Sequence, residues 1–329
     1  MKTNDERIDE VLSEATPRPV PGSGRKEEIY GELRSEWLAS NQQVKRKRQY
    51  WVSGIAVSLV AALLIVTQLT TGIMTPVVSP DAVLARSVGA QTTVNGQRIE
   101  DAIPANEPLR FKSGDIISTG ADAAIAINWS TAGSLRMGAG SEVTLVSSEE
   151  IRLTSGEIYY DSRSFNSSNT TPIEVETDFG TISHVGTQFL ASVDSAGAKI
   201  SVREGQVTFE NATKSVVINS GESAHIDRGL VATILPITRN DEAWAWASQI
   251  APDWDVDGRS TMEIIHWLAR ETGLVVEFES ELASNYAASD RIRGIGKVEP
   301  TKAMRIIPIA TELNFEVNDG AIRIGMKDQ

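Results

Sequence analysis

The longest apolar segment of the chain runs from Trp51 to Met74, twenty-four residues without a single Asp, Glu, Lys or Arg. As an α-helix it would be about 36 Å long, enough to cross a hydrocarbon core of roughly 30 Å. A buried helix of a soluble protein would ordinarily show a polar face over such a length. The pattern therefore predicts a transmembrane helix over residues 51–74.

The charges on the two sides of this segment are unequal. No charged residue follows it before Asp81, whereas four basic residues precede it, Lys45, Arg46, Lys47 and Arg48. Positive charge stays on the cytoplasmic side of a membrane helix, so we expect the N-terminus in the cytoplasm and the C-terminus outside. A cleaved signal peptide does not fit, because the apolar run begins about fifty residues into the chain. A nucleic-acid or nuclear-localisation patch would use the same basic residues, but their place beside the apolar run favours a topology signal.

Residues 1–50 form a short predicted cytoplasmic arm, in which two helical pieces are separated by the Pro- and Gly-rich stretch Thr16–Gly24. The second piece carries a narrow apolar stripe at helical spacing, made of Ile29, Leu33, Trp37 and Leu38. An arm of this length buries too little surface to fold alone, so the stripe needs a surface to pack on. Two interpretations stay open here: a docking helix for a cytoplasmic protein, and a juxtamembrane tail without a partner.

After a predicted tether at residues 75–86, short runs of β-branched and aromatic residues separated by Gly, Asn, Asp and Ser continue over residues 87–235. This pattern is typical of many short strands. A Gly-containing unit recurs between the runs, at residues 113–115, 155–157, 204–206 and 220–222. Because Gly adopts positive φ without penalty, we expect these units to mark where successive strands reverse. The segment is predicted to be a mainly β domain, folded as a sandwich, a roll or an irregular solenoid.

Several motifs in this segment occur in the order found in one known domain. They are Phe179-Gly180-Thr181, then Gly186-Thr187 with Phe189, then Glu204-Gly205, and finally Gly221-Glu222. The segment resembles the FecR domain, over about residues 87–230. The resemblance implies a periplasmic domain behind a single span in the bacterial inner membrane, in the orientation that the charges predict. It also implies a transmembrane anti-sigma regulator, which relays a signal from an outer-membrane TonB-dependent transporter to a cytoplasmic ECF sigma factor.

The last ninety or so residues change character. Residues 236–259 are a predicted linker with a Trp-rich helix, and residues 260–329 a small α+β domain. Apolar spacing predicts a helix over Ser260–Gly273 and a strand over Leu274–Phe278, and a second strand, helix and hairpin follow. Pro308 leaves the extent of the second helix open. The two units resemble the STN module, a short domain shared by secretins and TonB-dependent transducers.

Composition excludes several classes of protein. A net charge of −13, from 31 Lys+Arg and 44 Asp+Glu, leaves no surplus of basic residues for nucleic acid. The absence of Cys excludes disulfides, thiolate nucleophiles and Cys-ligated zinc. No paired-carboxylate or Ser/His constellation is recognisable, and the three histidines lie far apart in the sequence, at His184, His225 and His266. We therefore expect neither enzymatic activity nor a cofactor.

Two further patterns allow competing interpretations. Asp253, Asp255, Asp257 and Gly258 match the start of a calcium loop, but Ile264 stands where the bidentate Glu is needed, which favours an acidic turn without metal. Trp244, Trp246 and Trp254 allow a ligand platform, although packing of a linker helix is favoured. His184 is expected to be a satisfied or exposed strand residue.

These patterns together predict a transmembrane signal-transducing regulator of an ECF sigma factor, with the apolar stripe of the arm as the sigma-factor contact. The signal would come from an outer-membrane TonB-dependent transducer or another envelope protein. A single transmembrane helix transmits a rigid-body movement poorly, so we expect the relay to need membrane proteases rather than such a movement. The alternative is a membrane-anchored periplasmic binding or scaffolding protein with no sigma-factor partner.

Overall fold

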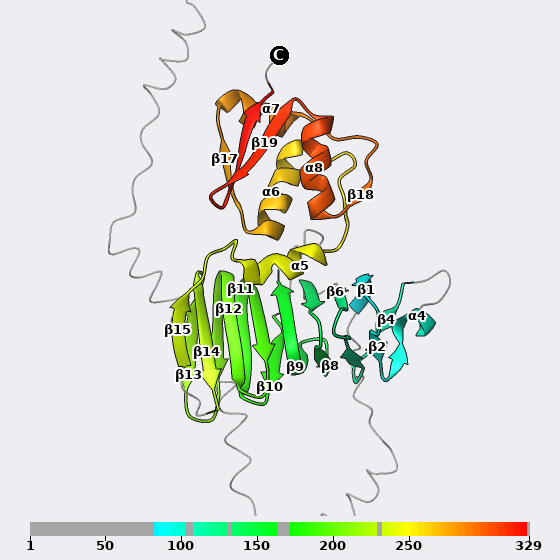
Figure 1. Cartoon of the computed structure of the whole chain (residues 1–329), viewed down its shortest axis with the longest axis vertical. Coiled ribbons are helices and arrows are strands. Elements are labelled where there is room, and N and C mark those ends of the chain that lie inside the picture. The colour runs from blue at the N-terminus through cyan, green and yellow to red at the C-terminus, as the bar shows by residue number, and fades with distance from the viewer. Residues whose placement is uncertain (1–81, 103–107, 130–132, 163–171, 229–231, 328–329) are drawn as a thin grey trace, which may run out of the picture. The chain divides into compact units, whose positions relative to one another are not determined.

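The computed structural model describes residues 82–102, 108–129, 133–162, 172–228 and 232–327. The predicted arm, the predicted transmembrane helix and most of the predicted tether lie outside these residues. Within the described ranges, no helix has the length and apolar character needed to cross a membrane. The described part consists of a β domain, a short helical linker and a smaller C-terminal module (Figure 1).

In its described residues, the β domain has fifteen strands in one continuous sheet and a short helix α4 at Ile99–Ala102. The strands are β1 (Ala82–Val88), β2 (Thr93–Val94), β3 (Gln97–Arg98), β4 (Arg110–Phe111), β5 (Ile116–Ser118), β6 (Ala124–Trp129), β7 (Gly133–Met137), β8 (Glu142–Leu145), β9 (Glu150–Asp161), β10 (Glu174–Thr177), β11 (Gly180–Val193), β12 (Gly197–Glu210), β13 (Ser215–Asn219), β14 (Glu222–Asp227) and β15 (Ala232–Pro236).

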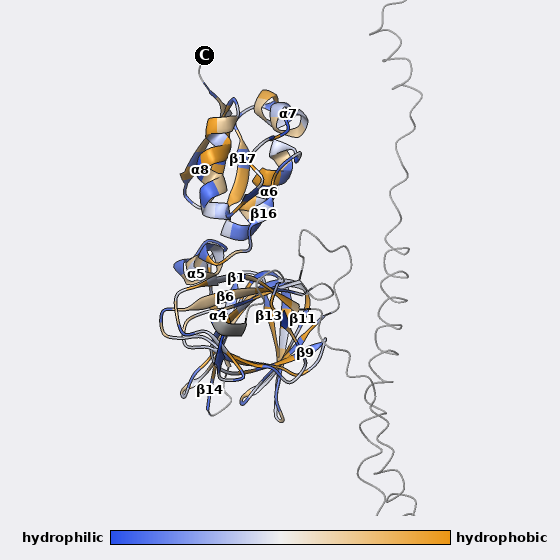
Figure 2. Ribbon diagram, turned by 90° about the vertical axis from the view of Figure 1, so that its right-hand side faces the viewer, coloured by the Kyte–Doolittle hydropathy of each residue, from blue (hydrophilic) through white to orange (hydrophobic). Residues whose placement is uncertain are grey.

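The sheet has two halves that share the three long strands β9, β11 and β12. Half-sheet A contains, in order, β4, β1, β6, β7, the second part of β9, the second part of β11, the first part of β12, β14 and β15. Half-sheet B contains β3, β2, β5, β8, the first part of β9, β10, the first part of β11, the second part of β12 and β13. Strands that bend from one layer to another make the corners of such folds. The domain is a rolled sheet around one core (Figure 2), so among the predicted alternatives the structure is closest to the roll.

Each long strand bends at a glycine in the left-handed region. The φ angles are 83° at Gly156, 62° at Gly186 and 80° at Gly205. A Cβ on Gly205 would lie 2.6 Å from the carbonyl oxygen of Gly186, so the bends of β11 and β12 are in direct contact. A residue with a side chain fits neither the backbone angle nor the space at Gly205.

These bends correct the prediction that the Gly-containing units mark strand reversals. At residues 155–157 and 204–206 the strand continues and passes from one half-sheet to the other. At residues 113–115 and 220–222 the chain likewise passes between the half-sheets, from β4 to β5 and from β13 to β14. A glycine with positive φ fits a bend as well as a turn, and the partners on each side of it decide which one forms.

The core lies between the two half-sheets, and the alternation of its residues shifts at each bend. In β12, Ile200 and Val202 are buried before Gly205, whereas Val207 and Phe209 are buried after it. An unbroken strand would bury positions of one parity throughout. The bend therefore moves the inward face by one residue, and β9 and β11 show the same shift.

The linker and the C-terminal module follow β15. The linker holds a 3-10 turn η1 (Glu242–Trp244) and helix α5 (Ala245–Gln249). The module contains β16 (Trp254–Asp255), α6 (Thr261–Thr272), β17 (Val275–Phe278), α7 (Glu281–Ser289), β18 (Lys297–Val298), α8 (Pro300–Ala310), β19 (Leu313–Asn318) and β20 (Ala321–Met326). β16 pairs with β18 in a two-stranded sheet, and β17 and β19 flank β20 in a separate three-stranded sheet, in which strands of the two predicted units pair. Both also contribute to a single core. The sequence analysis did not predict α7.

Local signals account for the bounds of the module's main elements. Helix α6 begins at Ser260, whose side chain and Glu263 form a reciprocal capping box, and ends at Gly273 with φ 75°. These bounds match the predicted helix. Helix α8 keeps Pro308 in its last turn, and the predicted hairpin is formed by β19 and β20, whose turn has φ 51° at Asp319.

Candidate functional site

The FecR motif residues lie mainly at the corners and in the core of the β domain. Gly186 and Gly205 form the two contacting bends, Thr187 and Phe189 are buried beside them, and Phe179 packs against the core. Phe179 lies in the turn between β10 and β11, Gly180 and Thr181 begin β11, and a Cβ on Gly180 would lie 2.6 Å from the ring of Phe209. Glu222 follows Gly221 and accepts a hydrogen bond from the amide of Asn219 at 2.7 Å. Most of the motif is therefore architectural.

Glu204 differs from the other motif residues because its carboxylate contacts the C-terminal module. Its Oε2 accepts a hydrogen bond from Arg270 Nη1, near the end of α6, at 2.7 Å. The same guanidinium pairs with Asp161 at the end of β9, where Nε donates to Oδ2 at 3.1 Å. Gln188 on β11 donates to the same Asp161 oxygen at 3.0 Å. Burial lowers the pKa of Arg270 by itself, but the attraction of Asp161 outweighs it and the pKa is raised.

A second ion pair beside Arg270 is almost completely buried. Arg136 on β7 and Glu271 on α6 are 1% and 6% exposed, and Nη2 donates to Oε2 at 2.8 Å. Arg136 Nη1 also donates to the carbonyl of Ala247 in α5 at 2.7 Å, and its guanidinium lies 4.7 Å from the ring centre of Tyr159. Burial disfavours the charged guanidinium, yet the attraction of Glu271 raises the pKa of Arg136 above its ordinary value.

Arg203, next to Glu204 on β12, is buried with fewer polar partners. Its guanidinium lies 4.5 Å from the ring centre of Trp244, and Nη1 donates to the carbonyl of Glu271 at 3.3 Å. Nε and Nη2 have no hydrogen-bond partner within the described residues. Burial accordingly lowers the pKa of Arg203. Aromatic faces attract buried cations, which compensates part of that cost.

We call these six charged residues the junction network: Arg136, Asp161, Arg203, Glu204, Arg270 and Glu271. The network holds three guanidinium groups and three carboxylates, and Arg136 and Arg270 form its ion pairs. Its residues come from β7, β9, β12 and α6, and it surrounds the aromatic contact between Tyr159 and Trp244. The arrangement holds the linker and the end of α6 on the outer face of half-sheet A. Its ion pairs and hydrogen bonds join β7, β9 and β12 to α5 and α6.

The sequence analysis identified Glu204 but none of the other five members of the network. Arg136 and Glu271 are 135 residues apart in the chain, and no local pattern links them. One signal was available: the outward positions of β9 and β11 hold Tyr159 and Leu190 rather than polar residues. Apolar residues on both faces of a strand indicate that both faces are covered.

The structure also locates the other predicted candidates. The stripe residues Ile29, Leu33, Trp37 and Leu38 and the basic residues Lys45, Arg46, Lys47 and Arg48 lie outside the described residues. Asp253 pairs with Arg86 of β1 at 3.3 Å, and Asp257 accepts a hydrogen bond from the amide of Gly294, so these two carboxylates have partners outside the acidic turn. In the part of the chain that the structure describes, no group of three or more His, Asp or Glu side chains is placed to hold a metal ion.

The tryptophans and His184 are packing residues. Trp244 is 1% exposed against Tyr159, whereas Trp254 packs on Trp267 with ring centres 5.2 Å apart in the module's core. They do not form one platform. His184 is buried, and its Nε2 accepts a hydrogen bond from the amide of Ile173 at 3.2 Å. Burial lowers the pKa of His184 to about 4.

The corners, the core and the charged bend at Glu204 belong to one mainly β domain. Residues 115–208 match the family model described as FecR protein. These residues are therefore a FecR domain, as the motifs predicted. No curated protein matches the chain.

Two solved structures are similar to the chain. Both are crystal structures of a "putative anti-sigma factor" from Parabacteroides distasonis ATCC 8503, at 1.65 Å and 2.50 Å resolution. They are 14% and 15% identical to this chain, with TM-scores of 0.33 and 0.32. Each match covers 65% of this chain and 99% of the solved one.

Proposed function

We propose that the chain is a transmembrane signal-transducing regulator of an ECF sigma factor. The FecR domain at residues 115–208 carries the proposal, because regulators of this class place that domain outside the membrane. The uncharged segment at residues 51–74 and the basic residues before it support a single pass through the bacterial inner membrane. The N-terminal arm is then cytoplasmic, and the FecR domain and the C-terminal module are periplasmic.

The two ends of the chain have different roles in this proposal. The C-terminal module, which we interpret as STN-like, receives the signal from an outer-membrane TonB-dependent transducer or another envelope protein. Its Arg270 pairs with Glu204 of the FecR motif, so a partner that moves α6 acts directly on a corner of the β domain. In the cytoplasm, the arm binds the sigma factor through Ile29, Leu33, Trp37 and Leu38. Membrane proteases complete the relay by freeing the arm.

A reporter for sigma-dependent transcription tests the contact with the full chain in its own membrane. Trp37→Ala removes the largest apolar side chain of the stripe, and Gln42→Ala is a matched control on the same predicted helix. We expect Trp37→Ala to change the transcriptional response and to abolish co-purification of the sigma factor at unchanged membrane levels. An unchanged response, with no sigma factor recovered by the wild-type chain, would instead favour the anchored periplasmic binding protein.

Topology is tested separately, and the absence of Cys makes that test simple. Ser23→Cys lies in the predicted cytoplasmic arm, and Ser215→Cys lies on an exposed position of β13. In intact spheroplasts a membrane-impermeant maleimide should label the second variant only. Labelling of the first variant, or of both, would contradict the proposed orientation.

A further inference from the structure

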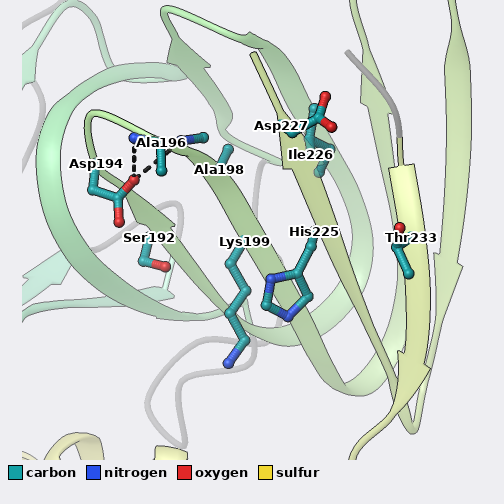
Figure 3. Close-up of a pocket in the computed structure, with 10 residues that line it drawn as sticks. Ser192, Asp194, Ala196, Ala198, Lys199, His225, Ile226, Asp227 and Thr233 are labelled. Carbon is teal, nitrogen blue, oxygen red and sulfur yellow. Dashed lines mark hydrogen bonds between the residues drawn. The ribbon is translucent and has the colours of Figure 1, made fainter. Parts of the chain in front are cut away.

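The outer face of half-sheet A is only partly covered by the linker, and a pocket of about 340 Å³ lies on the part left open. The covered part holds Tyr159, Leu190 and Trp244. The open part borders the hairpin between β11 and β12 and reaches β14 and β15 (Figure 3). Its volume is at the lower end of the range for small-molecule sites, roughly 300–1,000 Å³.

Strand pairing places one row of polar side chains across this pocket. Ser192 on β11 is opposite Lys199 on β12, Lys199 is opposite His225 on β14, and His225 is opposite Thr233 on β15. Directly opposite residues on one face have Cβ atoms about 5 Å apart. The side chains of Lys199 and His225 lie next to each other in Figure 3 and extend to the same side. Four strands thus present an ammonium, an imidazole and two hydroxyls in line.

Hydrogen-bond donors in the row are available, whereas the nearby carboxylates are engaged. Asp194 Oδ1 accepts from the amides of Ala196 and Gly197, at 2.7 Å and 3.0 Å, which closes its own turn. Asp227 has an interaction of its own and is directed away from Lys199 in Figure 3. Within the described residues, no hydrogen bond or ion pair holds Lys199 Nζ or the ring of His225.

One further carboxylate faces this row. Glu157 on β9 is opposite Ser192, so it lies two strands away from Lys199, about 10 Å by strand spacing. The pKa of Glu157 is raised, because the effect of burial outweighs the attraction of Lys199, which lowers it. At that distance Glu157 attracts the ammonium without saturating its three donors. The row therefore offers hydrogen-bond donors that Glu157 does not occupy.

We infer that this pocket binds the anionic group, a carboxylate or a phosphate, of a small solute in the compartment of the β domain. Lys199 and His225 face the anion, and the hydroxyls of Ser192 and Thr233 donate to its outer oxygens. Charge-assisted hydrogen bonds of this kind are the strong ones, and an open rim lets the remainder of the solute extend outward. The inference concerns the β domain alone and holds whether or not the chain regulates a sigma factor.

The test measures acylation of lysines in the full chain, in detergent micelles, by mass spectrometry. The probes are inorganic phosphate and succinate, each compared with sodium chloride at matched ionic strength. Lys214, exposed between β12 and β13, is the internal control. At a probe concentration about ten times the Kd, we expect acylation of Lys199 to slow about tenfold and that of Lys214 to stay unchanged.

Two variants distinguish specific binding at this pocket from nonspecific attraction of anions to charged residues. His225→Val should weaken the protection of Lys199 by phosphate, and Lys214→Gln should leave it intact. A further measurement with phosphatidylglycerol vesicles distinguishes a lipid headgroup from a free anion. Protection of Lys199 by vesicles alone supports the same chemistry from a lipid source. The inference would be overturned by equal protection of Lys199 and Lys214, by protection of Lys199 by sodium chloride equal to that by the probes, or by no protection in any of the measurements.

Discussion

The buried pair of Arg136 and Glu271 allows a quantitative test of how the C-terminal module is held. Glu271→Ala removes the carboxylate that lies 2.8 Å from Arg136 Nη2 and leaves the cation buried. Removing one partner of a buried ion pair costs about 3–5 kcal/mol. Arg136 would keep its bond to the carbonyl of Ala247 and its contact with the ring of Tyr159. We therefore expect a loss of about 3 kcal/mol, at the lower end of that range.

Hydrogen exchange of the full chain measures this loss locally. The peptides to follow cover α5 and the end of α6, because these segments contact Arg136. A decrease of about 3 kcal/mol in the free energy of opening accelerates their exchange by more than about 100-fold. Peptides from β13, on half-sheet B and remote from the junction network, should exchange as in the wild type.

Glu277→Ala is the matched control for this experiment. Glu277 pairs with Arg323 at 3.1 Å, but the two side chains are 51% and 48% exposed. An exposed pair contributes less than about 1 kcal/mol. The double variant Arg136→Met with Glu271→Leu removes both charges and should recover most of the loss. If Glu271→Ala costs no more than Glu277→Ala, the docking role of the buried pair is refuted.

Three further predictions concern the packing of single residues and are all measured by urea unfolding. The pKa of His184 is about 4 in the folded chain, below its ordinary value of 6.5, so the unfolded chain binds the extra proton and stability falls as the pH decreases from about 6 to 4.5, by about 1.4 kcal/mol per pH unit. His184→Asn should remove this contribution, and equal slopes in both proteins would contradict it. Gly205→Ala should destabilise the chain by more than about 2 kcal/mol, because its Cβ would meet Gly186. The control Gly114→Ala has the same sign of φ but open space around it, and should cost about 1 kcal/mol. Equal costs would show that the contact with Gly186 does not matter. Ser260→Ala should cost about 1 kcal/mol through loss of the α6 cap, and a change below a few tenths would contradict the capping role.

The FecR motifs were recognisable from the sequence, but their roles were not. Gly205 was expected to mark a strand reversal, and the structure places it in a bend within one strand. The change in parity from Ile200 and Val202 to Val207 and Phe209 is a signal that the sequence analysis did not use. Parity alone does not say which strands lie on each side, because pairing partners are set by distant segments.

The C-terminal module was more predictable because its signals are local. Ser260, Glu263 and Gly273 lie within one helix and its caps, and each satisfies backbone groups a few residues away. The turn at Asp319-Gly320 likewise depends on its own φ angles. Helix α7 has a weaker pattern, with only Ala283 and Ala287 buried, so its sequence indicated no apolar stripe.

The sequence by itself determined the character of each segment: an uncharged run beside basic residues, short strands separated by glycines, and amphipathic helices. These properties follow from hydrogen bonding and burial over a few residues. Only the tertiary structure decided that the three long strands divide one sheet into two halves. It also decided that Arg136 and Arg270 pair with three carboxylates, and that Lys199 and His225 share an open face. Such contacts depend on strand register and on segments up to 135 residues apart, which local patterns do not encode.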